Sequence, residues 1–160
     1  MPDMKWTELE AEPCSVARTV SVIGDRWTLL VLRECFLGVK RFEEFQERLA
    51  ISRPMLVDRL HKLVEAKVLK KVAYQQTPTR YDYRLTPKGL DLHPVLMAIV
   101  HWGDIHMAGK AGRPLLHRHS GCGHLFDPVT VCSECRAALS AREVTVEAGP
   151  GAQDAGHTHR

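Results

Sequence analysis

The chain has 160 residues, and its 22 Lys and Arg against 19 Asp and Glu give a formal net charge of +3. This length and an ordinary composition predict one globular domain with room for an appendage, and no apolar run approaches the roughly 20 residues that a membrane-spanning helix needs. The acidic N-terminus lacks the apolar segment of a signal peptide, and five cysteines without an obvious disulfide framework fit a reducing compartment, so we expect a cytoplasmic protein.

The beginning of the chain predicts an arm followed by two helices. Residues 1–13 are expected to form a loosely ordered, flexible arm. Apolar residues at helical spacing predict a short amphipathic helix over residues 14–23 that Gly24 closes. Asp25 is well placed as the N-cap of a second helix over residues 26–37. This helix is apolar around most of its circumference and is therefore expected at the centre of the core.

A helix-turn-helix followed by a β-hairpin is predicted between Arg41 and Thr86. The two helical patterns and the two strand patterns cover residues 41–49, 52–66, 68–74 and 81–85. Only two residues separate the helices; Ser52 is expected as the N-cap of the second, and Pro54 in its first turn loses no intrahelical hydrogen bond. Pro78 lies between the strands, as suits a hairpin tip. The order helix, turn, helix and hairpin is that of a winged helix-turn-helix.

Positive charge is concentrated in the second half of this unit. Between Arg53 and Lys88, nine Lys and Arg stand against three acids, a local balance of +6 that exceeds the net charge of the whole chain. Double-stranded DNA is therefore the expected partner. An α-helix fits the major groove, and Arg can bridge two acceptors on one guanine, so we predict base contacts from Arg53 and Arg59. The predicted phosphate contacts are Lys40, Arg41, Ser52 and Lys62, and the predicted hairpin-tip contacts to the backbone or the adjacent minor groove are Thr79 and Arg80.

The last part of the chain predicts a long helix, a linker, an appendage and a tail. The pair Thr86-Pro87 is suited to start a helix that runs to about Met107, with Pro94 bending or interrupting it. A long apolar helix at the end of a small domain often buries its surplus face against a second copy, so we expect a homodimer. A linker, a small Cys/His appendage and a disordered tail are expected at residues 109–114, 115–146 and 147–160. No internal repeat is apparent.

The appendage carries a Cys/His cluster, with HRHSGCGH over residues 117–124 and CSEC over residues 132–135. A tetrahedral structural zinc site needs four N or S ligands. The predicted set is Cys122, Cys132 and Cys135 with one of three competing histidines, for which we select His119. A reduced or redox-labile dithiol and a metal-free remnant of a zinc ribbon are the alternatives. An open catalytic zinc is not expected, because no carboxylate or HExxH pattern accompanies the cluster to act as general base.

Several motifs are shared with one known family. They are the cysteine before the first helix (Cys14), IGDRWTLLVLRE, RFEEFQ, LVDRLHKLVEAKVL and YDYRLTPKG. On these motifs, residues 14–104 closely resemble the HxlR-type winged helix-turn-helix transcriptional regulators of bacteria, a MarR-like group. The resemblance implies a mainly α (α+β) DNA-binding and dimerisation domain, which we place over residues 14–108, with its first and last helices forming the dimer interface. One departure is Lys67, where glycine is expected: a left-handed lysine there would cost about 1 kcal/mol.

The resemblance also implies a sensor. Members of the family commonly respond to oxidants, electrophiles or aldehydes through a cysteine near the N-terminus, the position that Cys14 occupies. The positive end of a helix dipole favours the reactive thiolate there. The alternative is an inert residue at a helix start. Cys35, in the apolar helix, is expected to belong to the core.

These observations predict a cytoplasmic regulator, nucleoid-associated when bound to DNA. It is expected to repress transcription as a homodimer on a pseudo-palindromic operator and to respond to a redox, electrophile or small-molecule signal. No nucleophile–base pair, Gly-rich phosphate loop or carboxylate dyad supports an enzyme. Two other classes remain open: a winged helix that docks proteins without specific DNA binding, and a small zinc metalloenzyme built on the Cys/His cluster.

Overall fold

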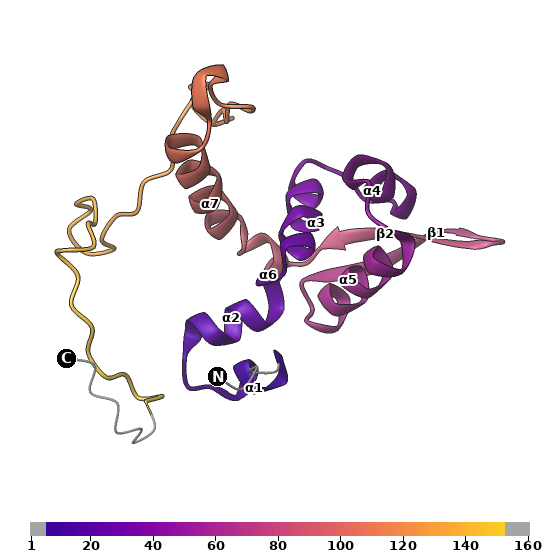
Figure 1. The fold of residues 1–160 in the computed structure, drawn as a ribbon, viewed down its shortest axis with the longest axis horizontal. Helices are drawn as coiled ribbons and strands as arrows, with labels where there is room; N and C mark the ends of the chain where they lie inside the picture. Colours follow the sequence, from indigo (N-terminus) through magenta and orange to yellow (C-terminus); the bar gives the residue numbers. More distant parts are fainter. Residues whose placement is uncertain (1–5, 153–160) are drawn as a thin grey trace. The chain divides into compact units, whose positions relative to one another are not determined.

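The computed structural model describes residues 6–152, with side chains from Glu8 onward. The chain divides into two compact units, Met1–Leu96 and Met97–Arg160. The first unit contains α1 (Trp6–Ala11), α2 (Ser15–Ile23), α3 (Arg26–Phe36), α4 (Phe42–Leu49), α5 (Arg53–Glu65), β1 (Leu69–Gln76), β2 (Thr79–Leu85) and α6 (Pro87–Leu90) (Figure 1). Helix α7 (His93–His106) crosses the boundary and the 3-10 helix η1 (Gly109–Ala111) follows it. This is the mainly α, α+β composition that the sequence predicts.

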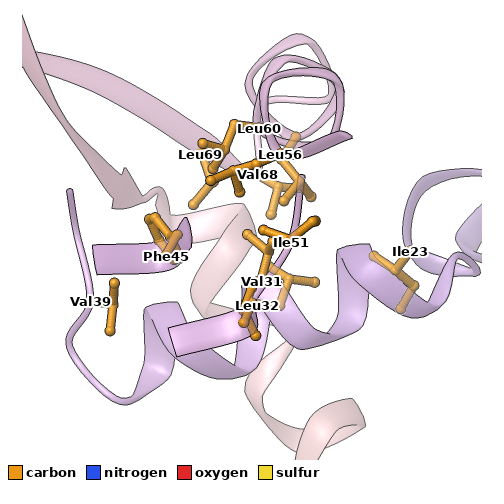
Figure 2. Packing of buried hydrophobic residues seen from close by; sticks show 12 residues of the cluster. Ile23, Val31, Leu32, Val39, Phe45, Ile51, Leu56, Leu60, Val68 and Leu69 are labelled. Atoms are coloured by element: carbon orange, nitrogen blue, oxygen red, sulfur yellow. The ribbon is translucent and has the colours of Figure 1, made fainter. Parts of the chain in front are cut away.

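The core of the first unit lies where α3, α4, α5 and the hairpin meet (Figure 2). Helix α5 supplies Leu56, Leu60 and Leu63, whose spacing places them on one face, and all three are buried. They belong to one cluster with side chains from the other elements, chiefly Val31, Leu32, Phe45, Val68 and Leu69. Burying each such side chain contributes about 1.5–3 kcal/mol to folding. The opposite face of α5 is thereby turned outward.

The ends of the core helices follow the sequence signals, with one exception. The carboxylate of Asp25 accepts hydrogen bonds from the backbone N–H groups of Trp27 (2.9 Å) and Thr28 (3.2 Å), which confirms it as the N-cap of α3. Gly38 follows α3 with a φ of +92°, a left-handed conformation that stops the helix. Ser52 occupies the N-cap position of α5, but its hydroxyl makes no capping hydrogen bond. The sequence therefore predicts the position of Ser52 correctly, but the expected capping hydrogen bond is not formed.

The wing is an antiparallel hairpin of β1 and β2 with a turn at Thr77-Pro78. Leu69 pairs with Leu85 at its base, and both strands run two residues further toward the tip than their sequence patterns predict. The backbone N–H of Tyr83 donates to the carbonyl of Lys40 (2.8 Å), so the segment before α4 lies alongside β2. This contact joins the wing to the helix-turn-helix.

The turn between α5 and β1 contains a left-handed residue although it has no glycine. Lys67 has a φ of +61°, which costs a non-glycine residue about 1 kcal/mol. Two hydrogen bonds hold the turn: the Thr86 hydroxyl donates to the carbonyl of Lys67 (2.6 Å) and the Lys88 ammonium donates to the carbonyl of Ala66 (2.8 Å). Gly89 permits this close approach, since a Cβ there would collide with a backbone oxygen just after the turn.

One expectation from the sequence is wrong and another is confirmed. The N-terminal segment 1–13 is not a loose arm throughout, because residues 6–11 form helix α1, which packs against α2.

The helix expected from Thr86-Pro87 onward is interrupted, giving α6 and α7. Pro94 explains the break, because it lacks an N–H and its ring would clash with the carbonyl four residues earlier. It therefore stands in the first turn of α7.

The second unit has little regular structure after η1. Residues 112–152 contain no helix and no extended strand. Two isolated β-bridges, Arg118 with Leu125 and Val131 with Ala138, mark two short hairpins there. Of the expected tail, residues 147–152 have no regular structure and residues 153–160 lie outside the described residues. None of the described helices is long and apolar enough to cross a membrane.

A buried carboxylate links α3 to α4. Glu34 is 2% exposed, and each of its oxygens pairs with a different cation. Oε1 lies 2.6 Å from Nη2 of Arg33, and Oε2 lies 2.5 Å from Nε of Arg48. Both arginines reach the surface, whereas the carboxylate does not, so the two cations offset the cost of burying its charge.

We predict that replacing Arg33 and Arg48 together by Ala lowers the free energy of unfolding by about 3–5 kcal/mol, because it leaves a buried carboxylate without a cation. Either single substitution should cost less, since the other arginine remains paired. Urea unfolding followed by circular dichroism measures both. Arg142→Ala, at an exposed position of the second unit, is the control. A double variant that unfolds at the same urea concentration as this control would contradict the prediction.

Candidate nucleic-acid interface

The outward face of α5 is the centre of the candidate interface. The buried leucines fix the rotation of the helix, so Arg53, Val57, His61 and Lys62 are exposed. Arg53 stacks over the ring of Phe42, with its guanidinium carbon 4.7 Å from the ring centroid. The stacking restricts the Arg53 side chain, while its exposure leaves N–H donors available to a ligand.

Arg59 does not share this face. Its side chain is only 15% exposed; its Nε lies 2.9 Å from Oδ1 of Asp25, and its Nη1 donates to Oδ2 of Asp58 (2.8 Å). The contact with Asp25 is an ion pair without hydrogen-bond alignment, since Nε has no hydrogen-bond partner among the described residues. The predicted base contact from Arg59 therefore conflicts with the structure, in which Arg59 joins α5 to the start of α3. The helical pattern alone places this residue at the margin of the outward face.

The other predicted contacts of the helix-turn-helix are exposed. Ser52 stands at the N-terminus of α5, and Lys40 precedes α4. Lys62 pairs with Asp58 one turn earlier, with Nζ 3.2 Å from Oδ2. Because both partners of this pair are exposed, water screens it and it holds Lys62 only weakly. These three side chains can reach a phosphate without any rearrangement of the core.

Arg41 is positioned by the wing. Its guanidinium carbon lies 4.7 Å from the ring centroid of Tyr74, and its Nε lies 3.9 Å from Oδ1 of Asp82. Asp82 is buried and also pairs with Arg84 (2.9 Å). The Arg41 side chain nevertheless remains 55% exposed. It is therefore oriented by its neighbours and still accessible from solvent.

An open hollow of about 260 Å³ lies between α5 and the wing. Arg53 and Val57 line it from α5, and Thr79 and Arg80 line it from the hairpin tip. The structure thus brings three of the predicted contact residues around one hollow. The hydroxyl of Thr79 is already engaged, since it donates to the carbonyl of Gln76 (3.1 Å).

Three tyrosines that were not predicted from the sequence, Tyr74, Tyr81 and Tyr83, line the same hollow. Tyr81 and Tyr83 are two residues apart on β2 and so share a face, where Nζ of Lys71 lies 5.6 and 5.8 Å from their ring centroids. Burial raises the pKa of Tyr83, and the charge of Glu43 and the neighbouring Tyr81 raise it further. Its hydroxyl therefore remains a donor at neutral pH. The alternation of tyrosines in β2 was the available sequence signal.

The two cysteines of the first unit differ in their surroundings. Cys14 is exposed and occupies the N-cap position of α2. Burial raises the pKa of the Cys35 thiol to about 12, and the charge of the neighbouring Glu34 adds to the effect. Cys35 therefore stays a neutral thiol at physiological pH, which fits its expected place in the core.

The four predicted metal ligands occur as two pairs. Nδ1 of His119 lies 3.3 Å from Sγ of Cys122. The pKa of Cys132 is lowered because the backbone N–H groups of Cys135 and Glu134, and the Cys135 thiol, form hydrogen bonds with its sulfur. Within residues 6–152, no group of three or more His, Cys, Asp and Glu is arranged to hold a metal ion. The predicted set of four is therefore not assembled in this structure.

Known proteins resemble this chain in sequence and in structure. A model of the HxlR-like helix-turn-helix family matches residues 22–111. The uncharacterized HTH-type transcriptional regulator Rv3095 of Mycobacterium tuberculosis is 43% identical over 137 residues, which cover 86% of this chain and 87% of the relative. The crystal structure of PA1607, named a putative transcription factor, is 32% identical with a TM-score of 0.78, over 86% of this chain and 96% of PA1607. The redox regulator HypR in its oxidized form is 31% identical with a TM-score of 0.54, over 58% of this chain and 97% of HypR.

The mycobacterial match extends past the winged helix. A match of 137 residues within a chain of 160 includes residues 24–137 wherever it begins. It therefore takes in both short hairpins of the second unit almost completely. The alignment with this relative covers residues 115–137 of the appendage, whereas the match to HypR is confined to little more than half of the chain.

We predict that Arg59→Ala lowers the free energy of unfolding by about 1–3 kcal/mol, because it removes a largely buried cation that contacts two carboxylates. Arg53→Ala, on the exposed face of the same helix, should change it by less than about 0.5 kcal/mol. Urea unfolding of the two variants measures the difference. Equal losses of stability would argue against the inward placement of Arg59.

Proposed function

This chain belongs to the HxlR-like helix-turn-helix family of transcriptional regulators. We propose that it is a sequence-specific DNA-binding repressor that acts as a homodimer on a pseudo-palindromic operator. The observation that carries the proposal is the surface formed by α5 and the wing, where Arg53 and Arg80 line one hollow. A helix with this exposure fits the major groove, and a wing tip reaches the adjacent backbone or minor groove.

The proposed DNA contacts divide into one base contact and several phosphate contacts. Arg53 is the base contact, since it lies on the outward face of α5 near its N-terminus and carries a two-pronged donor. Lys40, Lys62 and Arg41 are phosphate contacts that set the register of the helix in the groove. Ser52 joins them, because its hydroxyl makes no capping hydrogen bond and is available to donate to a phosphate.

The wing adds a second point of attachment. Arg80 is the proposed contact of the tip, because it is exposed and lines the hollow. Thr79 contributes less, since its hydroxyl already donates within the turn. Tyr74 and Tyr81 present partly exposed rings that can pack against the sugar–phosphate backbone, and Lys71 lies over the second of them.

Exposed apolar side chains on two helices support a homodimer. Helix α7 exposes Ile99, Trp102 and Ile105, and helix α2 exposes Val16 and Val20. Apolar surface of this kind is commonly covered by a partner, and a second copy forms a self-complementary interface. In the proposed dimer, two recognition helices enter successive major grooves about 34 Å apart.

A link between α2 and α5 supports control by a thiol. Cys14 begins α2, which ends at Ile23, two residues before Asp25. Asp25 contacts Arg59 of the recognition helix. In the proposed mechanism, an oxidant or electrophile modifies the Cys14 thiol, α2 shifts in the dimer, and the shift moves α5 out of register with the operator. The redox regulator HypR, which shares the winged-helix fold and is 31% identical, makes this kind of signal a natural one to test.

The test of the proposed function is fluorescence anisotropy with DNA from upstream of its own gene and with a scrambled duplex of equal length, each at two salt concentrations. We expect a strong preference for the upstream DNA and a steep salt dependence. Arg53→Ala should weaken binding to the upstream DNA by about 10–100-fold, the cost of one base contact. Lys62→Ala should weaken binding to both duplexes alike and reduce the salt slope by about 1. Equal, weak binding to both duplexes would favour a protein-docking winged helix instead.

The sensor role of Cys14 predicts selective chemistry at that thiol. Iodoacetamide should modify Cys14 faster than free cysteine at neutral pH and leave Cys35 unmodified, as mapped by mass spectrometry. An electrophile should release the wild-type protein and Cys35→Ser from operator DNA, but not Cys14→Ser. A rate at Cys14 no higher than that of free cysteine, or release of Cys14→Ser, would rule out this sensor.

A further inference from the structure

The appendage contains two hairpins with the same backbone hydrogen bonds. In the first hairpin, the N–H groups of His119, Gly123 and Phe126 donate to the carbonyls of His124, His119 and His117. In the second hairpin, the N–H groups of Cys132, Arg136 and Leu139 donate to the carbonyls of Ala137, Cys132 and Thr130. Every donor and acceptor of the second hairpin lies 13 residues after its counterpart in the first, and the two β-bridges obey the same shift. The two hairpins of the appendage therefore form an internal repeat, which was not apparent in the sequence.

The repeat places metal-binding residue types at matching positions. His119 corresponds to Cys132, and Cys122 corresponds to Cys135. Each hairpin thus offers two residues with N or S donor atoms, separated by two others. An HxxC pair in the first hairpin is the structural equivalent of the CxxC pair in the second.

The turn after the second donor residue is left-handed in both hairpins. Gly123 has a φ of +73° and Arg136 has a φ of +62°. Glycine adopts this conformation readily, but an arginine does so at a cost of about 1 kcal/mol. The turn therefore imposes the left-handed conformation on Arg136, which an arginine rarely adopts by itself.

The two donor residues of the first hairpin already face each other. Nδ1 of His119 is 3.3 Å from Sγ of Cys122. The His119 ring lies against the turn because position 121 is glycine, where a Cβ would stand 2.9 Å from the ring. In the second hairpin, Cys132 and Cys135 hold the positions that correspond to His119 and Cys122.

Packing of apolar side chains does not account for these turns. The apolar residues of the two hairpins, Leu125, Phe126, Val131 and Leu139, are between 39 and 50% exposed. A segment this short rarely folds on backbone hydrogen bonds alone, and natural examples usually use disulfides or a metal. The cysteines of the appendage are all free thiols. A bound metal can supply the stability that these hairpins lack.

We propose that residues 117–139 form a structural zinc site whose four ligands are His119, Cys122, Cys132 and Cys135. Three thiolates and one imidazole are a common ligand set of tetrahedral structural zinc, and soft thiolates select zinc over magnesium or calcium. With four protein ligands no position stays open for a substrate, so the site is structural and not catalytic. This proposal does not depend on the proposed DNA binding.

The repeat distinguishes His119 from the two other histidines of the first hairpin. His117 corresponds to Thr130 and His124 corresponds to Ala137. Neither of those positions in the second hairpin carries a zinc ligand. A site built from two equivalent hairpins therefore uses His119.

Zinc binding requires the two hairpins to close on one another. No three candidate ligands surround a common point in the part of the chain that the structure describes. The short connection over residues 127–129 joins the two hairpins and is where they would close. Four metal–ligand bonds then supply the free energy that packing does not, and the cysteines lose their protons as the metal binds.

The first test is the zinc content of the full-length protein, purified without a polyhistidine tag and measured by plasma mass spectrometry. We expect one zinc ion per chain. Cys135→Ser should remove it, whereas Cys35→Ser, a cysteine of α3, should retain it. Zinc well below one ion per chain after growth in zinc-supplemented medium, or a Cys132–Cys135 disulfide in its place, would overturn the proposal.

Histidine variants test the choice of ligands. Competition with a colorimetric chelator should show zinc binding at least about 100-fold weaker for His119→Ala, since even changes beyond the ligands cost about 10–100-fold. His117→Ala and His124→Ala should bind as tightly as the wild type, and His119→Cys should keep the metal by completing a second CxxC pair. Helical circular dichroism, which arises outside the appendage, verifies that each variant is folded. Equal losses in all three alanine variants would refute the ligand set.

Discussion

The contact between Asp25 and Arg59 joins the start of the central helix α3 to α5. Asp25 caps α3 through two backbone N–H groups and also faces the guanidinium of Arg59 in the recognition helix. One carboxylate therefore caps the central helix and contacts Arg59 of α5, whose rotation is fixed by its buried leucines. Helix α2 ends two residues before Asp25, and its last residue, Ile23, belongs to the same buried cluster as Leu60 of α5.

Acidic residues of the first unit form ion pairs with some of its Lys and Arg side chains. Asp58 pairs with Arg59 and Lys62, and Asp82 pairs with Arg41 and Arg84. A count of charges between Arg53 and Lys88 therefore overstates the number of cations that are free to meet phosphates. The pairs have a second effect, because they orient the side chains that remain exposed. A cation held at a fixed place loses less side-chain entropy when it binds DNA.

The two units are stabilised by different means. The first buries leucines, valines and a phenylalanine between three helices and a hairpin (Figure 2), and two arginines neutralise its buried Glu34. The second unit repeats a backbone turn twice and buries almost none of its apolar side chains in doing so. A structural metal fits a segment of this kind, in which side chains that would form a core are replaced by ligands.

The sequence by itself determined the elements whose signals are local. Caps, turn glycines and prolines act within one turn of the chain, so Asp25, Gly38 and Pro94 predict the starts and ends of helices, and alternating residues predict the wing. Only the tertiary structure decided which charges face outward, because the partner that turns Arg59 inward lies 34 positions away at Asp25. The tyrosines of the hollow meet α5 only once the wing has folded beside it. The repeat of the appendage lies mainly in its backbone hydrogen bonds, because few residue types match at corresponding positions and His119 stands where the second hairpin has Cys132.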